Sequence, residues 1–188
     1  MRSENSVKKI AIVVGSLRKD SYSGKLAKAM KQLAEGKLEM DIVELRDLPM
    51  YDPDIDTETP PPAFTAFRER IRAADGVLFI TPEYNRSVPG ALKNAIDVGS
   101  RPYGKAAWAN KPCAIVSQSP GALGGFGANH HLRQMLPFLN MPAMPAPEAY
   151  LGGIASKFEG EALTDDGLRS FLQTFVDAFA AWVERHAD

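Results

Sequence analysis

Short apolar runs alternate with longer amphipathic stretches along most of the chain. An apolar run of about 4 to 8 residues is typical of a buried parallel strand. Three such runs lie at Lys8–Val14, Gly76–Thr81 and Cys113–Ser117. The stretch Leu38–Leu45 alternates apolar and polar residues, which predicts a half-exposed edge strand. A short fifth strand is expected within Met141–Ala149, where prolines favour irregular or edge structure.

Helical periodicity predicts five helices between and after these strands. They are expected at Tyr22–Ala34, Ala63–Ala74, Pro89–Val98, Ala128–Phe138 and Leu168–Val183. The last shows one continuous apolar stripe, and Thr164 is placed to cap it. Strands that alternate with helices predict an α/β fold, a doubly wound five-stranded parallel sheet between two helical layers, with an open order such as 2-1-3-4-5.

Composition narrows the class of protein. The chain has 188 residues, of which 45% are hydrophobic and 24% charged, so we expect a short tail at residues 1–7 and one domain at residues 8–188. The net charge of −1 gives no electrostatic reason to expect a nucleic-acid or membrane partner, and it argues against a strongly acidic electron shuttle. The single cysteine, Cys113, excludes an internal disulfide and fits a reducing compartment. Without a long apolar run, a cytoplasmic protein is expected.

The segment Gly15–Ser23, between the first strand and the first helix, is the strongest candidate site. Its three serine hydroxyls, the Arg18 guanidinium and the N–H groups at the helix start predict a pocket for a terminal phosphate. It contains neither Gly-x-x-x-x-Gly-Lys-Ser/Thr nor Gly-x-Gly-x-x-Gly, so it is neither a nucleotide P-loop nor a dinucleotide fingerprint. The alternative is a polar turn in which Ser21 or Ser23 caps the helix and nothing binds.

Two more loops are expected at the same edge of the sheet, because ligands of open α/β sheets bind beyond the carboxyl ends of the strands. The first is Thr81–Gly90, in which Pro82 and Tyr84 would form a wall for a planar heteroaromatic ligand. The backbone of Glu83, Tyr84 and Asn85 would face the edge of that ligand. The alternative is a stiff proline turn with Tyr84 lying on the surface.

The second of these loops, Gln118–Gly127, is rich in glycine and follows the fourth predicted strand. Ser117 and Gly121 are small residues that would leave room for the ligand on its other side. A glycine-rich loop alone is weak support for a site. The loop adds to the hypothesis only because it is expected beside the other two.

Other polar clusters suggest less specific roles. His130 and His131 are adjacent on a predicted helix, where neighbouring side chains diverge, so a cap or an interface is favoured over a metal site. The acidic run from Asp52 to Glu58 lacks the glycine and glutamate pattern of a calcium loop, and solvated charge is favoured there. No metal is therefore expected. Arg101 follows the third helix, where its charge complements the helix end. The sharper hypothesis places it at the mouth of the ligand pocket, where it would attract anionic acceptors or the phosphate of a pyridine nucleotide.

Three motifs together resemble the NADPH-dependent FMN reductases, and among them the bacterial chromate/quinone reductases of flavodoxin-like fold. They are Gly-Ser-Leu-Arg-x-x-Ser from Gly15, Leu-Pro-Met-Tyr from Leu48, and Pro-Glu-Tyr-Asn from Pro82 with the following Ser87–Asn94. The resemblance runs in order from Lys8 to Tyr150. It implies bound FMN, hydride supply from NADPH or NADH, and two-electron reduction of quinones and metal oxyanions such as chromate. It also implies a homodimer or homotetramer whose interface completes the sites.

The resemblance assigns roles to particular residues. Those that match its phosphate-binding loop are Ser16, Arg18, Ser21 and Ser23. Those that match its isoalloxazine segment are Pro82, Glu83, Tyr84 and Asn85, with Ser117 as a further contact from the fourth strand. Relatives often carry asparagine at the position of Ser23, but a hydroxyl still bonds phosphate. No catalytic side chain is expected, because the flavin carries the reaction.

Two functions follow from this pattern. The first is an FMN-dependent NAD(P)H oxidoreductase with a broad range of acceptors, to which azo compounds would be a further addition. The alternative is a flavodoxin-type electron carrier, or a flavin-binding partner, that does not itself turn over NAD(P)H. The near-neutral net charge favours the enzyme, because carriers use charged docking faces.

Overall fold

A computed structural model of the chain describes residues 7–187. The five predicted strands form one parallel sheet in the order β2-β1-β3-β4-β5. They span, in chain order, β1 Lys8–Val14, β2 Leu38–Val43, β3 Gly76–Pro82, β4 Cys113–Gln118 and β5 Ala149–Leu151. The predicted strand order is confirmed. Residues 1–6 of the predicted tail and Asp188 lie outside the described part of the chain.

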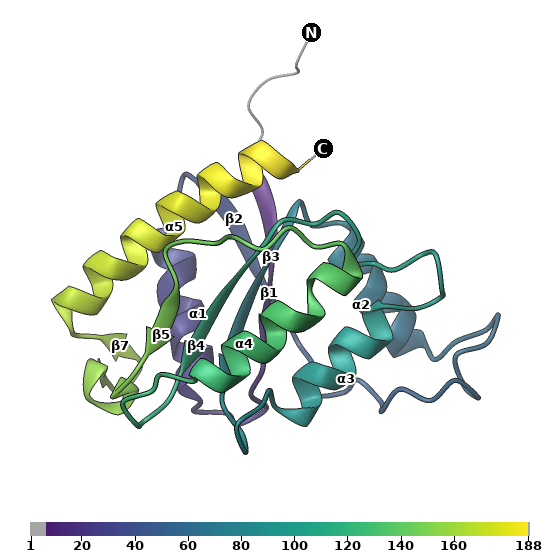
Figure 1. Cartoon of the computed structure of the whole chain (residues 1–188), viewed down its shortest axis with the longest axis horizontal. Coiled ribbons are helices and arrows are strands. Elements are labelled where there is room, and N and C mark those ends of the chain that lie inside the picture. The colour runs from purple at the N-terminus through teal and green to yellow at the C-terminus, as the bar shows by residue number, and fades with distance from the viewer. Residues whose placement is uncertain (1–6, 188) are drawn as a thin grey trace, which may run out of the picture.

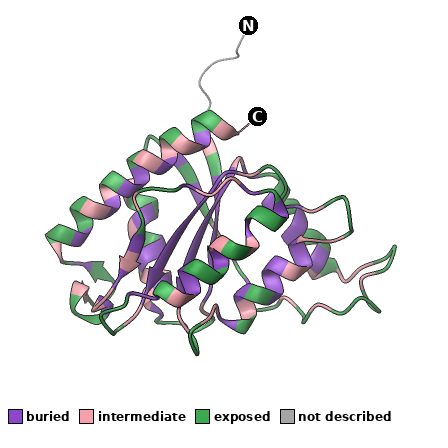
Figure 2. Ribbon diagram, viewed as in Figure 1, coloured by how far each residue is buried: buried purple, intermediate pink, exposed green. Residues whose placement is uncertain are grey.

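Helices cover both faces of the sheet (Figure 1). They are α1 Tyr22–Leu33, α2 Pro62–Arg72, α3 Gly90–Gly99, α4 Phe126–Met135 and α5 Asp166–His186, with short 3-10 helices at Pro137–Leu139 and Ile154–Lys157. Helices α1 and α5 share one apolar core with the sheet, and α2, α3 and α4 share the other. The inner strands β1, β3 and β4 are almost entirely buried (Figure 2), which explains their continuous apolar runs. The edge strand β2 alternates buried and exposed residues, as predicted.

The two faces have cores of different composition. The core under α1 and α5 is mainly aliphatic, with Phe175 and Phe179 as its large fully buried rings. The opposite core is built around Trp108, whose ring lies 5.7 Å from that of Phe67 and 5.8 Å from that of Phe79, between centroids. The indole N–H of Trp108 donates to the Ile96 carbonyl at 3.0 Å, so its polar atom is satisfied in the core.

Several predicted boundaries were wrong, mostly where proline intervenes. The last strand begins only at Ala149, beyond most of the predicted range Met141–Ala149, because prolines cannot donate ladder hydrogen bonds. Helix α4 ends at Met135, and a 3-10 turn replaces its predicted last turn at Pro137. Asp165, one residue after the predicted cap Thr164, caps α5 by accepting a hydrogen bond from the Leu168 N–H at 2.6 Å.

A small antiparallel hairpin was not predicted at all. Its strands are β6 Phe158–Glu159 and β7 Ala162–Leu163. The hairpin packs on the start of α1, where the Lys25 ammonium donates to the Gly160 carbonyl at 2.5 Å and the Lys28 ammonium lies 2.7 Å from the Glu161 carboxylate. Strands of two residues carry no readable alternation, so their pairing depends on tertiary contacts.

Candidate active site

The loop between β1 and α1 has the geometry of an anion site. The Ser21 hydroxyl accepts a hydrogen bond from the Gly24 N–H at 3.1 Å, which confirms Ser21 as the N-cap of α1. As an acceptor, this hydroxyl still has its own proton to donate. Ser16 is half-buried and the Arg18 side chain is exposed. Within residues 7–187 no carboxylate forms an ion pair with Arg18, so its guanidinium is free to bind an anion.

Ser23 lies deeper, in the first turn of α1, and connects this loop to β4. It is fully buried, and its hydroxyl accepts a hydrogen bond from the Gln118 side-chain amide at 3.1 Å. The other end of that amide, Gln118 Oε1, is buried without any hydrogen-bond partner among the described residues. An unsatisfied buried acceptor beside the loop is explained when a group from outside the chain donates to it. Gln118 was not predicted as a site residue, because a single glutamine at a strand end forms no distinctive pattern.

The loop between β3 and α3 forms a tight turn at the same edge. The backbone N–H of Tyr84 donates to the Ser87 carbonyl at 2.9 Å, and the Ser87 N–H donates to the Tyr84 carbonyl at 3.0 Å. Both central residues have left-handed backbones, with φ of 51° at Asn85 and 65° at Arg86. Tyr84 is 50% exposed, so its ring stays available at the surface. Pro82 ends β3 and is buried.

Glu83 has a structural contact in addition to its predicted place in the site. Its carboxylate is mostly buried and accepts a hydrogen bond from the Ala128 N–H, in the first turn of α4, at 3.1 Å. A carboxylate at a helix N-terminus is favoured by the helix dipole. The Glu83 side chain therefore ties the β3–α3 turn to α4, and only the backbone of this residue remains to line a ligand.

The β4–α4 loop is held close to β5 by glycines. At Gly124, which has a φ of +59°, an added Cβ would lie 2.3 Å from the Tyr150 carbonyl carbon, so no other residue fits there. Gly121 is exposed, and its carbonyl accepts hydrogen bonds from Ser119 Oγ and the Gly153 N–H. The loop thus presents Gly121 at the edge of the sheet, as predicted from its position after β4.

The Ser117 hydroxyl, in contrast, forms its hydrogen bonds within the protein interior. It donates to the Ala149 carbonyl at 3.2 Å and accepts from the Asn129 side-chain amide at 3.2 Å, and the residue is fully buried. This hydroxyl has no spare donor for a ligand. Any contact of Ser117 with a ligand would use its backbone or the space left by its small side chain.

The two histidines at the start of the predicted fourth helix diverge, as expected. His131 Nδ1 lies 2.9 Å from Ser87 Oγ, whereas His130 Nε2 lies 3.1 Å from the Tyr150 hydroxyl. Burial, followed by the Glu148 carboxylate, raises the pKa of Tyr150 above its ordinary value. Across residues 7–187, no three histidine, cysteine or acidic side chains gather where they would hold a metal ion.

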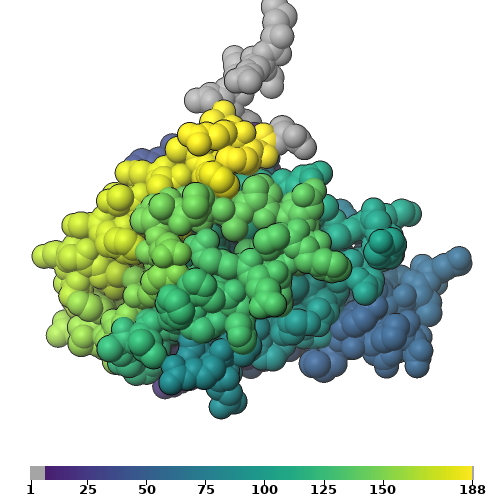
Figure 3. Space-filling model, viewed as in Figure 1, coloured from purple at the N-terminus to yellow at the C-terminus, as the bar shows by residue number. Residues whose placement is uncertain are grey.

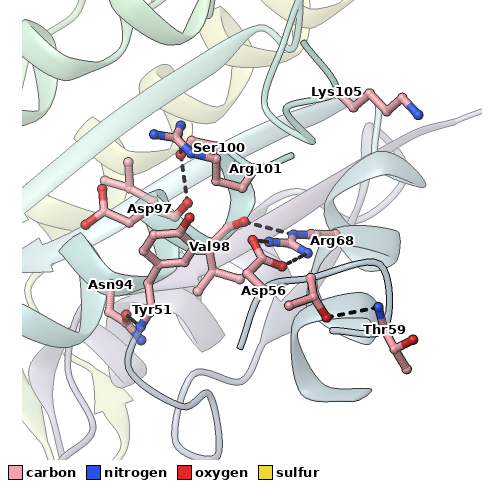
Figure 4. Close-up of polar contacts among 12 residues, drawn as sticks. Tyr51, Asp56, Thr59, Arg68, Asn94, Asp97, Val98, Ser100, Arg101 and Lys105 are labelled. Atoms are coloured by element: carbon pink, nitrogen blue, oxygen red, sulfur yellow. Dashed lines mark hydrogen bonds and ion pairs between the residues drawn. The ribbon is translucent and has the colours of Figure 1, made fainter. Parts of the chain in front are cut away.

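Arg101 lies away from the three loops within one chain. It follows α3, whose first residue adjoins the β3–α3 turn and whose ten residues extend about 15 Å. Figure 4 shows Arg101 beside the C-terminal end of α3, where its guanidinium lies 3.3 Å from Ser100 Oγ. The structure does not bring Arg101 together with the other predicted site residues of the same chain.

The acidic loop before α2 was predicted to be solvated, and for Asp56 this was wrong. The Asp56 carboxylate forms two hydrogen bonds with Arg68, at 2.9 and 2.6 Å, and both side chains are 4% exposed (Figure 4). Arg68 also donates from Nε to the Val98 carbonyl at 2.9 Å. The Asn94 side chain, on α3, accepts from the Tyr51 N–H of the same loop and donates to its Pro49 carbonyl. These contacts anchor the long loop, which leaves the carboxyl end of β2, to α2 and α3.

Cys113 packs in the hydrophobic core, as predicted from its apolar neighbours in the sequence. The side chain is fully buried in β4, and burial raises the pKa of the thiol to about 12. The reactive thiolate is therefore scarce at neutral pH. Among residues 7–187, none of the helices combines the length and apolarity that a membrane crossing requires.

Comparison with known proteins identifies the family. The family of NADPH-dependent FMN reductases matches residues 8–155. The chain belongs to this family. It is 61% identical over 180 residues to a protein named quinone reductase from Pseudomonas putida, an alignment that covers 96% of this chain and 97% of the relative. It is 45% identical over 176 residues to 2-hydroxy-1,4-benzoquinone reductase from Burkholderia sp., covering 93% and 96%.

A solved structure agrees with this family. The protein FerB, described as a flavoenzyme NAD(P)H:(acceptor) oxidoreductase from Paracoccus denitrificans, superposes with a TM-score of 0.91 at 44% identity, covering 97% of this chain and 100% of FerB. A flavodoxin from Pseudomonas aeruginosa, with a TM-score of 0.59 and 17% identity, shares the fold alone. The predicted flavodoxin-like fold is thus confirmed. The protein is an oxidoreductase enzyme that uses FMN and NAD(P)H.

The residues at the sheet edge fit FMN. Its phosphate requires donors, which Arg18, the Ser21 hydroxyl proton and the first N–H groups of α1 supply. Its ribityl hydroxyls are donors, and Gln118 Oε1 is a buried acceptor that has no partner in the described part of the chain. Its flat ring system requires an apolar wall at the edge of the sheet, where Pro82 and the half-exposed Tyr84 lie.

Proposed function

We propose that the protein is an FMN-dependent NAD(P)H:quinone reductase. The observation that carries this proposal is the convergence of three loops at one sheet edge, the first with free phosphate donors and the second with an exposed aromatic ring. The relative that shares 61% of its residues over nearly the whole chain carries the name quinone reductase, which supports quinones as the acceptors.

In this proposal the protein binds and positions FMN and the substrates, and the cofactor carries the reaction. Bound FMN would supply the redox chemistry, a two-electron hydride transfer from NADPH or NADH to the acceptor. The residues proposed to hold its phosphate are Ser16, Arg18, Ser21 and Ser23. Those proposed to line its ring are Pro82, Glu83, Tyr84 and Asn85, with Ser117 and Gly121 on the other side. The exposed turn leaves one face of the site open to substrates.

The finer parts of the proposal concern acceptors, assembly and location. We include metal oxyanions such as chromate, and azo compounds, as further acceptors, on the strength of the sequence resemblance. We also infer a homodimer or homotetramer in the cytoplasm. Large exposed apolar side chains support association, since Tyr103 is 92%, Phe138 88% and Met50 72% exposed. Light scattering on the purified protein would measure the oligomeric state.

The first test is the absorbance spectrum of the purified protein, before and after NADPH is added without oxygen. Flavin bands that bleach within seconds, and recover when a quinone is added, are the expected result. Flavin that binds but stays oxidised would contradict the proposal and favour an electron carrier. A protein that takes up no flavin would show that the Gly15–Ser23 loop has been misinterpreted.

A further inference from the structure

The turn between β3 and α3 carries an arginine in an unfavourable backbone conformation. The paired Tyr84 and Ser87 hydrogen bonds and the positive φ at both central residues define a type I′ turn. Such turns favour asparagine followed by glycine, because glycine adopts a left-handed backbone without steric cost. Asn85 fits this preference, but the glycine position is occupied by Arg86, with a φ of 65°. The chain therefore carries a long cationic side chain at a position where the backbone conformation favours glycine.

This turn is fixed in place by three contacts with α4. The carbonyl oxygen of Arg86 packs so closely on Gly127 that a Cβ there would lie 2.8 Å from it. Glu83 Oε2 accepts from the Ala128 N–H at 3.1 Å, and Ser87 Oγ lies 2.9 Å from His131 Nδ1. The strained conformation is thus imposed by packing, which is how strain is maintained at functional sites.

The turn projects from the edge of the sheet that carries the site. It emerges at the carboxyl end of β3, at the bottom of the view in Figure 1, and forms a protrusion at the bottom of the molecular surface in Figure 3. The adjacent residues Tyr84 and Asn85 are those proposed to line the flavin ring. A side chain on this turn therefore lies where substrates of the flavin approach.

The guanidinium of Arg86 is free to bind a ligand. Its side chain is 77% exposed, and its nearest carboxylate oxygen, Glu83 Oε1, lies 3.8 Å away. At that distance and exposure the ion pair contributes little. The Glu83 carboxylate is mostly buried and already accepts from the Ala128 N–H. Most of the five donors of the guanidinium fork thus have no acceptor within residues 7–187.

We propose that Arg86 binds anionic oxygens of the substrates at the flavin site and so determines the preference for anionic over neutral substrates. Two sources supply this chemistry, the 2′-phosphate of NADPH and a sulfonate, carboxylate or oxyanion on the acceptor. The proposal rests on the proposed reductase function, because it assumes that electron acceptors enter at this edge. The planar fork of Arg86 would bind either anion through paired hydrogen bonds.

The experiment compares the FMN-loaded wild-type protein with Arg86→Gly, Arg86→Lys and the remote control Arg185→Ala. Glycine removes the charge and relieves the backbone, so a melting temperature equal to or above that of the wild type would show that the fold is intact. Steady-state kcat/KM is measured with menadione, which is neutral, and with 1,2-naphthoquinone-4-sulfonate, which is anionic. A second arm measures kcat/KM for NADPH and NADH, and the dissociation constants of NADP⁺ and NAD⁺ with the oxidised holoenzyme.

For Arg86→Gly we expect a loss of about fivefold for the sulfonated quinone, for NADPH and NADP⁺, or for both. The matched partner, menadione or the 2′-phosphate-free NADH and NAD⁺, should change less than twofold. Arg86→Lys should show a smaller loss than Arg86→Gly. Arg185→Ala should keep the wild-type preference, because Arg185 lies at the end of α5, remote from the turn. A loss confined to the sulfonated quinone identifies the acceptor as the source of the anion. A loss confined to NADPH and NADP⁺ identifies the 2′-phosphate.

Equal changes for both members of both pairs, or no change at all, would overturn the proposal. The proposed reductase function fails separately, if the wild-type holoenzyme oxidises NADPH but reduces neither quinone. In that case the dissociation constants of NADP⁺ and NAD⁺ still decide whether Arg86 binds an anion. The two hypotheses are therefore tested by different measurements on the same protein.

Discussion

Arg68 on α2 lies beside the end of α3, and Arg86 lies just before its start. The two show how the same side chain serves the fold in one place and the site in another. Near the end of α3, Arg68 is 4% exposed and every contact it makes is internal, to Asp56 and to the Val98 carbonyl. Near the start of α3, Arg86 is 77% exposed on a strained turn and has one long contact to Glu83. A buried cation with its fork filled stabilises a loop, whereas an exposed cation with an empty fork is available to a ligand.

The largest effect in this comparison is expected from Arg68→Ala. The substitution leaves the Asp56 carboxylate buried without a partner, which typically costs about 3–5 kcal/mol of unfolding free energy. In a protein of this size that corresponds to a melting temperature lower by roughly 6–20 °C. Differential scanning calorimetry of the apoprotein measures the melting temperature. The binding free energy of FMN should change far less than the unfolding free energy.

A matched control lies on the same helix. Arg70 forms an exposed ion pair with Asp41, so Arg70→Ala should cost less than about 1 kcal/mol. The double variant Arg68→Met/Asp56→Leu removes both buried charges and should recover much of the stability lost in Arg68→Ala. If Arg68→Ala and Arg70→Ala were equally stable, the buried pair would not anchor the loop, and the contrast between the two arginines would lose its basis.

An intermediate effect is expected from Arg18→Ala, at the phosphate loop. Hydrogen bonds to a charged group contribute about 1.5–3 kcal/mol, so the dissociation constant of FMN should rise about 10- to 150-fold. Fluorescence titration of the apoprotein with FMN measures this constant. The stability of the apoprotein should stay within about 0.5 kcal/mol of the wild type, because Arg18 is exposed.

Two comparisons make this prediction sharper. Riboflavin lacks the phosphate, so its affinity should be nearly the same for Arg18→Ala and the wild type. Arg18→Lys keeps the charge without the planar fork and should bind FMN with an intermediate affinity. A riboflavin affinity that falls as far as the FMN affinity would mean that Arg18 does not bind the phosphate.

Periodicity predicted the fold well because the sheet is buried on both faces. Each of β1, β3 and β4 appears in the sequence as one apolar run, and the strand order follows from the alternation with helices. The errors occur where long-range contacts replace local pattern. The β6–β7 hairpin exists through its packing on α1, and β5 starts where the preceding prolines allow a ladder.

The site was predicted in part, at the level of loops more than of side-chain roles. Ser21 as a cap could be read from its position before a helix. The internal roles of Glu83 and Ser117 could not, because each depends on a helix more than ten residues away in the chain. The same limit applies to Asp56. In the sequence it is one of several acidic residues in a loop, and only the structure shows that it is paired with the buried Arg68. Arg86 lies in the predicted Thr81–Gly90 loop, but its left-handed backbone is visible only in the structure.

The smallest effect is expected from Arg101→Ala, which tests the remaining prediction for an arginine. Arg101 lies at the end of α3 remote from the turn, with only Ser100 Oγ as a side-chain partner among residues 7–187. Within a single chain we therefore expect equal, less than twofold changes in KM for chromate and for a neutral quinone. A KM that rises far more for chromate would show that Arg101 attracts anionic acceptors, as the sequence suggested, at a site reached from a neighbouring chain. Repeating the measurement under conditions where light scattering shows only monomer would separate these cases, because an effect carried across an interface disappears when the subunits dissociate.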